Sequence, residues 1–219
     1  MPVECEDWRH YPVGAYQIQQ EETGIARYYA GKYGFCRNHG ICLCSHCDTT
    51  LSLKPVKMVM DGVLKIDHHR VFPKYSSQTF ESWFKKNAMA SQDNYKKHVS
   101  FFHGCYTNYN FPQLGKDMVS VLNAIGYGVH LLEKEKCCGV ALISNGLINQ
   151  ARKQAEANLR SVRKSVFEDK RPVIGASSTC IFTMRDEYPH LLGIDNADVR
   201  DSIELGLPGS YSVCSKRET

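Results

Sequence analysis

Several features that would restrict the function of this chain are missing from its sequence. The longest apolar runs, such as GVALIS at residues 139–144, fall far short of the roughly 20 residues that a membrane-spanning helix needs. The first residues lack the basic, apolar and small-residue regions of a secretory signal peptide, so we expect no export. Lysine and arginine are spread along the chain rather than gathered into one block, which argues against a nucleic-acid partner. We therefore expect a soluble or peripheral protein in a reducing compartment.

Cysteine, in contrast, is abundant, with 10 residues in a chain of 219. In a reducing compartment, cysteines are more often metal ligands or redox groups than partners in disulfides. The densest group lies in FCRNHGICLCSHC, residues 35–47, where His39 and His46 stand among four cysteines. Thiols and imidazoles are the ligands of zinc, and thiols those of iron–sulfur clusters, so this segment is a candidate site by ligand type and spacing. Its cysteines are Cys36, Cys42, Cys44 and Cys47.

The middle of the chain alternates between apolar runs and helical patterns. Apolar runs typical of buried strands occupy residues 98–105, 129–133 and 172–178. Each run is followed by a segment with apolar residues at helical spacing. The alternation predicts an α/β fold, with a parallel sheet and crossover helices in the order βαβαβα. The three predicted helices are residues 111–126, 145–166 and 179–192.

The direction of the chain then places four cysteines. Cys105 lies at the C-terminal end of the first predicted strand, Cys137 and Cys138 lie just beyond the second, and Cys180 lies just beyond the third. Because parallel strands end at one edge of a sheet, we expect the four thiols to meet there, where open α/β sheets place their ligands. Each also lies near the start of a following helix, whose partial positive charge favours thiolate, and gathered thiolates suit a soft metal. The alternative is that these residues are small, buried apolar side chains without a ligand.

Residues 49–97 form a basic segment with two helical patterns. Pro55 suits the first turn of one helix, and Ser77 or Thr79 suits the start of a second, which carries Phe80, Trp83 and Phe84. Both helices either pack on the cysteine-bearing domain or lie on a membrane surface, as basic amphipathic helices do. Adjacent His68 and His69 point to different faces of a helix, so we assign them no metal role. The apolar stripe of the first helix is Val56, Val59, Met60, Val63 and Leu64.

The segment from FFHGCYTNYNFPQLGKDM through KCCGVALISNG, followed by VIGASSTCIFTMRDEYP, resembles the cysteine-rich CCG domains of electron-transfer subunits. The resemblance extends over about residues 50–205 and includes the C subunits of anaerobic glycerol-3-phosphate dehydrogenases and the heterodisulfide reductase subunits. In that family the pattern of a cysteine, a CCG and a CxxC holds a [4Fe–4S]-type cluster.

The resemblance implies a set of cluster ligands in this chain. Cys105, Cys137, Cys138 and Cys180 match the family's cysteines, and Gly139 would provide the tight turn that lets the backbone approach the cluster. Ser177 stands where the first cysteine of the CxxC would be, so the resemblance leaves open whether the cluster is complete. Ser177 and His103 are therefore candidates for supporting or substitute ligands.

By the same resemblance, the chain is a non-catalytic subunit that passes electrons through iron–sulfur clusters in anaerobic respiration. A flavoprotein that oxidises glycerol 3-phosphate and a second subunit would be its partners, and menaquinone the acceptor, at the cytoplasmic face of the inner membrane. One alternative is a thiol/disulfide oxidoreductase like the heterodisulfide reductase subunits. Another is a zinc-binding interaction module built on Cys36–Cys47. A third is the product of a broken gene with no function of its own.

The two ends of the chain depart from the family. Members carry a domain with two ferredoxin-type motifs before this region and a second CCG domain after it, and neither is recognisable here. If the codons of residues 1–48 are read one base later, the genetic code allows an amino-acid sequence similar to the one that family members carry before SLKPV. A shifted reading frame after Gly206 likewise allows a sequence similar to the family's continuation. We therefore interpret the chain as a frameshifted fragment with out-of-frame, irregular segments at 1–48 and 206–219, a helical segment at 49–97 and the CCG domain at 98–205.

Overall fold

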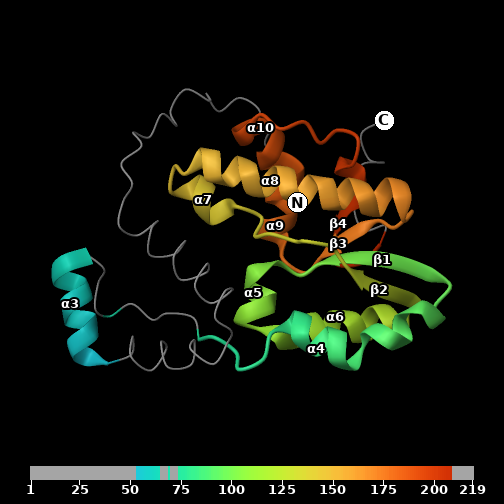
Figure 1. The fold of residues 1–219 in the computed structure, drawn as a ribbon, viewed down its shortest axis with the longest axis horizontal. Helices are drawn as coiled ribbons and strands as arrows, with labels where there is room; N and C mark the ends of the chain where they lie inside the picture. Colours follow the sequence, from blue (N-terminus) through green and yellow to red (C-terminus); the bar gives the residue numbers. More distant parts are fainter. Residues whose placement is uncertain (1–52, 65–68, 70–73, 209–219) are drawn as a thin grey trace, which may run out of the picture.

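A computed structural model of the chain describes residues 53–64, 69 and 74–208 (Figure 1). The predictions for residues 1–48, including the cysteines and histidines of residues 35–47, lie outside the described residues, as do His68 and residues 209–219.

The core of the described chain is a four-stranded sheet in the order β2-β1-β3-β4, with every neighbouring pair parallel. The strands are β1 (Lys97–Phe102), β2 (Tyr127–Leu131), β3 (Val173–Gly175) and β4 (Ile203–Leu205). The register aligns Phe101 with Leu131 and Phe102 with Gly175, so β1, β2 and β3 end close together. The predicted parallel α/β fold is thereby confirmed.

Helices cover both faces of the sheet (Figure 1). On one face, Val99 and Phe101 of β1 pack with Phe80 of α4 (Phe80–Asn87) and Leu122 of α6 (Pro112–Ala124). On the other face, Phe102 packs with a cluster from α8 (Ile148–Arg163), α9 (Ser178–Phe182) and α10 (Tyr188–Leu192). A strand buried on both faces reads as a continuous apolar run, which is why VSFF lacks strict alternation.

The predicted helices are present, but two are divided. The helix predicted at 145–166 begins at Ile148 in α8 and continues as a π-helical turn, η4 (Lys164–Glu168), and the short α7 (Val140–Ser144) precedes it. The helix predicted at 179–192 is α9, a second π-helical turn, η5 (Thr183–Glu187), and α10. The prediction that Cys105 ends the first strand was wrong in detail. β1 ends at Phe102, and Cys105 lies in the first turn of a helix that was not predicted, α5 (Gly104–Tyr109).

The two helical patterns before the sheet both form helices. In α4, Thr79 is the capping residue, since its Oγ1 accepts a hydrogen bond from Ser82 N at 3.1 Å. The aromatic residues Phe80 and Phe84 are buried, so this helix packs on the sheet; the 3-10 helix η3 (Met89–Asn94) then connects it to β1. The first pattern forms α3 (Lys54–Leu64), where Met58 and Val59 are 69% and 63% exposed. In Figure 1, α3 lies apart from the sheet.

Candidate metal centre

The order β2-β1-β3-β4 places a topological switch beside β1, because the chain runs from β1 outward to β2 and then returns to β3 on the other side. Open parallel sheets bind ligands at the carboxyl ends of the strands at such a switch. Here Cys105 lies in α5 after β1, Cys137 and Cys138 lie in the loop after β2, and Cys180 lies in α9 after β3. The fold therefore brings the predicted cysteines to one edge of the sheet.

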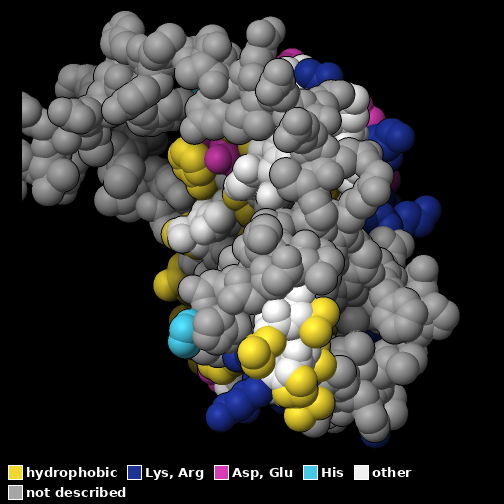
Figure 2. Space-filling model, turned by 90° about the vertical axis from the view of Figure 1, so that its left-hand side faces the viewer, with side chains coloured by type: hydrophobic (Ala, Val, Ile, Leu, Met, Phe, Trp, Pro, Cys, Tyr) yellow, Lys and Arg dark blue, Asp and Glu magenta, His cyan; other side chains and the backbone are white. Residues whose placement is uncertain are grey.

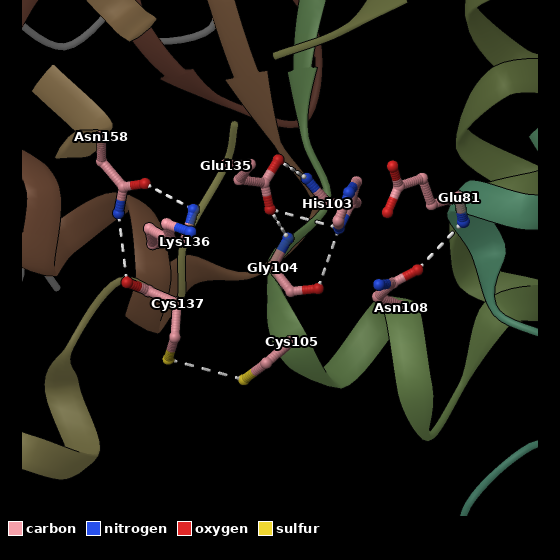
Figure 3. Close-up of polar contacts among 9 residues, drawn as sticks. All are labelled: Glu81, His103, Gly104, Cys105, Asn108, Glu135, Lys136, Cys137 and Asn158. Atoms are coloured by element: carbon pink, nitrogen blue, oxygen red, sulfur yellow. Dashed lines mark hydrogen bonds and ion pairs between the residues drawn. The ribbon is translucent and has the colours of Figure 1, made fainter. Parts of the chain in front are cut away.

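The thiols at this edge are close together and free. The Sγ atoms of Cys105 and Cys137 lie 3.7 Å apart and point toward each other in Figure 3. The thiol of Cys138 lies close enough to those of Cys137 and Cys180 for both to raise its pKa. Cys138 is buried, whereas Cys105, Cys137 and Cys180 are partly buried, and none of the four is in a disulfide.

Two glycines allow the backbone to bring these thiols together. Gly104 has φ +69°, and a Cβ at this position would lie 3.3 Å from Cys180 Sγ, closer than an easy contact. Gly139 has φ +92°, a left-handed conformation that L residues rarely adopt, and it begins α7 directly after Cys138. The predicted tight turn at Gly139 is therefore present.

Hydrogen bonds divide the four thiols into two kinds. The pKa of Cys137 is lowered, chiefly because its thiolate is favoured by hydrogen bonds to the thiols of Cys105 and Cys138. The pKa of Cys180 is lowered by its hydrogen bond to Cys138 and further by one to Ser177. The same shared hydrogen bonds, together with burial, raise the pKa of Cys105 and that of Cys138. Because metals bind thiolates, loading of this site would release protons.

A buried carboxylate joins the loop of Cys105 to the loop of Cys137 (Figure 3). Glu135 accepts hydrogen bonds from the backbone N–H groups of His103 at 3.2 Å and Gly104 at 2.8 Å. Its Oε1 also lies 3.2 Å from Nδ1 of His103, whose ring donates to the Gly104 carbonyl at 3.0 Å. Burial raises the pKa of Glu135 to about 7, against the opposing effect of His103.

Two further buried side chains, those of Asn158 and Tyr188, hold the CCG turn on the side away from Glu135. The carboxamide of Asn158 in α8 accepts a hydrogen bond from Lys136 N at 2.8 Å and donates to Cys137 O at 3.1 Å. The hydroxyl of Tyr188 in α10 donates to Cys138 O at 2.9 Å. Burial raises the pKa of Tyr188, so its hydroxyl keeps the proton that it donates.

In the described part of the chain, no group of three or more His, Cys, Asp or Glu side chains is arranged so that it could hold a metal ion as the side chains stand. The four thiols nevertheless fit an iron–sulfur cluster by their chemistry. They are soft ligands, free and partly shielded from water, and they come from three segments that meet at one edge of the sheet. A cluster of several irons also needs its ligands spread around a larger volume than a single ion does.

The other predicted site residues have identifiable positions. Ser177 is half-buried and hydrogen-bonds to Cys180, so it lies beside the thiols. His103 is buried and directs Nδ1 toward Glu135 and the Gly104 carbonyl. The sequence reasoning missed Glu135, Asn158 and Tyr188. Asn158 left a signal, since it is a polar residue on the apolar face of its helix, whereas Glu135 stands in the charged run EKEK and resembles a surface residue.

Comparison with known proteins agrees with this site. The sequence model of a family described as "CCG: Cysteine-rich domain" matches residues 99–185, which contain all four cysteines of the sheet edge. This is the class of domain that the motifs resemble, and the resemblance is confirmed. No solved structure matches the chain.

Among curated proteins, the chain is 57% identical over 158 residues to the C subunit of the anaerobic glycerol-3-phosphate dehydrogenase of Escherichia coli, a match that covers 72% of this chain and 40% of that protein. It is 27% identical over 176 residues to the D subunit of a heterodisulfide reductase of Methanosarcina mazei, covering 72% of this chain and 42% of the relative. It is 28% identical over 96 residues to an iron–sulfur protein of Methanococcus maripaludis, covering 44% of this chain and 19% of the relative.

The chain thus spans about two fifths of the length of the first two of these relatives. The family match and the relatives support an iron–sulfur cluster as the cofactor of the cysteine-rich domain. Among the described helices, none is both long enough and apolar enough to cross a membrane.

Proposed function

We propose that this chain is an electron-transfer subunit that holds an iron–sulfur cluster on Cys105, Cys137, Cys138 and Cys180. The observation that carries the proposal is the meeting of four free thiols, from the segments that follow β1, β2 and β3, at the carboxyl edge of the sheet. An iron–sulfur cluster, when bound, accepts and releases single electrons at a potential set by its surroundings. The chain's own residues would bind the group, orient it and limit its contact with water.

Two features of the chain would tune such a cluster. Glu135 and His103 form a buried acid–base pair directly beside the loop of Cys105, where charge strongly affects a metal group. The hydroxyl of Ser177 lies beside Cys180 in the position of the family's missing cysteine, and an oxygen there is a harder ligand than sulfur. We infer that Ser177 weakens the hold on the cluster relative to a complete cysteine set.

For the physiological role, we propose that the electrons come from a flavoprotein that oxidises glycerol 3-phosphate, assembled with a second subunit, and pass to menaquinone at the inner membrane. The support is the 57% identity to the C subunit of a glycerol-3-phosphate dehydrogenase. We also infer that α3 rests on the membrane surface from the cytoplasmic side. Met58 and Val59 are exposed on the same helix as Lys54, and Figure 2 shows hydrophobic side chains beside basic ones on the side of the molecule where α3 lies.

The rival role, a thiol/disulfide oxidoreductase, needs a substrate pocket beside the thiols. A cavity of about 570 Å³ runs along the open edge of β2 between Lys85 and Lys164, and no cysteine lines it. This cavity is therefore not one in which a disulfide substrate could meet these thiols.

The test is anaerobic reconstitution of the full chain with iron and sulfide, followed by iron analysis and electron paramagnetic resonance. We expect the wild-type chain to bind iron, and replacement of Cys105, Cys137 and Cys138 by serine to abolish binding. The matched control replaces the six other cysteines by serine, and we expect it to keep the spectrum. Loss of iron in the control with retention in the triple variant would contradict the proposal and favour the segment Cys36–Cys47. The six cysteines of the control are Cys5, Cys36, Cys42, Cys44, Cys47 and Cys214.

A further inference from the structure

Asn158 is a polar side chain in an apolar environment. It lies on the face of α8 that carries Ala151, Ala155 and Leu159, and it is only 1% exposed. A buried carboxamide is costly unless its donors and acceptor are all used. Its position in the core therefore calls for a specific set of partners.

Both amide hydrogens and the oxygen of this carboxamide are used, and two of the partners are backbone groups of Lys136 and Cys137, at the start of the CCG turn. The oxygen accepts from the Lys136 N–H at 2.8 Å, while one amide hydrogen is donated to Cys137 O at 3.1 Å. The other is donated to the Tyr188 hydroxyl at 3.2 Å. These roles also fix the orientation of the amide, because Lys136 N can only donate and Cys137 O can only accept.

Tyr188 extends the same network by one peptide unit. Its ring is fully buried in the core, and its hydroxyl accepts from Asn158 and donates to Cys138 O at 2.9 Å. Consecutive carbonyl groups of Cys137 and Cys138 are thus held by side chains from two different helices. The directions of the two Cα–Cβ bonds follow from the orientation of these peptides, and they limit the places that the thiols can reach to a few χ1 rotamers.

We propose that Asn158 and Tyr188 are positioning residues that hold the Cys137–Cys138 turn in the conformation in which both thiols face the shared site. The proposal rests on the proposed function for the identity of the ligand, but the geometry of the turn is a property of the cluster-free chain. Neither side chain is a ligand. Their effect is to pre-organise two adjacent ligands, as supporting residues do around metal sites.

The variants are Asn158→Leu, which keeps the size of the side chain, and Tyr188→Phe, which removes only the hydroxyl. The matched control is Asn196→Leu. Asn196 is likewise buried, at 2% exposed, and donates to the carbonyls of Met184 and Arg185 rather than to those of Cys137 and Cys138. A general loss of stability would therefore occur in the control as well.

The first measurement is the rate at which Cys137 and Cys138 of the full-length, cluster-free chain react with iodoacetamide, followed by peptide mass spectrometry. We expect both test variants to change this rate about 5-fold relative to wild type, as expected for the loss of one or two buried hydrogen bonds, and Asn196→Leu to leave it unchanged. The second measurement is iron affinity and reduction potential after reconstitution. There we expect about 10-fold weaker iron binding in the test variants and a shifted potential.

The proposal would be overturned if the alkylation rates of Cys137 and Cys138 were the same in Asn158→Leu and Tyr188→Phe as in the control Asn196→Leu. Iron affinity and reduction potential equal to those of wild type in both test variants would also overturn it. If the wild-type chain binds no iron, the proposed function fails. The alkylation rates then still decide whether the two residues position the turn.

Discussion

Replacing Glu135 by glutamine changes how the stability of the cluster-free chain depends on pH. The Glu135 side chain is only 6% exposed, and burial raises its pKa from 4.5 to about 7. The folded chain therefore holds this proton more tightly than the unfolded chain does. The resulting stabilisation is fully present below pH 4.5 and is lost as the pH rises through about 7.

The magnitude follows from the size of the shift. Each pKa unit corresponds to about 1.4 kcal/mol, so the shift from 4.5 to about 7 amounts to a loss of about 3 kcal/mol across this window. Glutamine does not titrate, but its NH2 group cannot accept the backbone N–H that one oxygen of Glu135 accepts, so we expect a loss of stability that does not depend on pH. Between pH 4.5 and about 7 we expect the difference in stability between Glu135→Gln and wild type to move by about 3 kcal/mol in favour of the variant.

The assay is urea unfolding of the reduced, cluster-free chain at a series of pH values from below 4.5 to above 7. The difference in free energy of unfolding between variant and wild type isolates Glu135 from other titrating groups. Glu133→Gln is the control, because Glu133 is exposed and its pKa is lowered by Lys164, which places its effect below pH 4.5. A difference between Glu135→Gln and wild type that stays constant over the whole series would refute the reasoning.

Three further predictions concern packing, the ligand set and the ends of the chain. Gly115→Ala is expected to destabilise the chain by about 1–2 kcal/mol in urea unfolding, because its Cβ would lie 2.5 Å from the buried ring of Phe80. The higher helix propensity of alanine offsets only part of this overpacking. A variant more stable than wild type would show that the ring can move. Ser177→Cys is expected to slow the loss of iron from the reconstituted chain to a chelator, and an unchanged rate would place Ser177 outside the ligand set. The nucleotide sequence around the coding region should encode ferredoxin motifs upstream and a second CCG domain downstream in shifted frames, and closed frames there would return Cys36–Cys47 to consideration as a metal site.

The sequence predicted where the cysteines meet better than it predicted the helices and strands around them. Parallel strands were expected from the alternation of patterns, and this alone placed Cys105, Cys137 and Cys180 at one edge. The strand β4 was missed because IEL is too short to give a periodic signal, and its place in the sheet comes from pairing with β3. The helix α5 was missed because a strand-like run and a six-residue helix meet at Gly104, whose positive φ ends one and begins the other.

Supporting residues are harder to predict than ligands because their role depends on contacts between distant segments. Asn158 lies 21 residues from Cys137 in the sequence, and Tyr188 lies 50 residues from Cys138. Both interactions exist only once α8 and α10 pack on the sheet. Glu135 likewise becomes a buried acid only when the loop after β2 folds against the start of α5.

The sequence by itself determined the α/β fold and the edge at which the four thiols meet, because the alternation of apolar runs specifies a parallel sheet and chain direction specifies which strand ends share an edge. Only the tertiary structure decided how these thiols are held. The hydrogen bonds of Glu135, Asn158 and Tyr188 join segments far apart in the chain, and their strength depends on burial that no local pattern encodes.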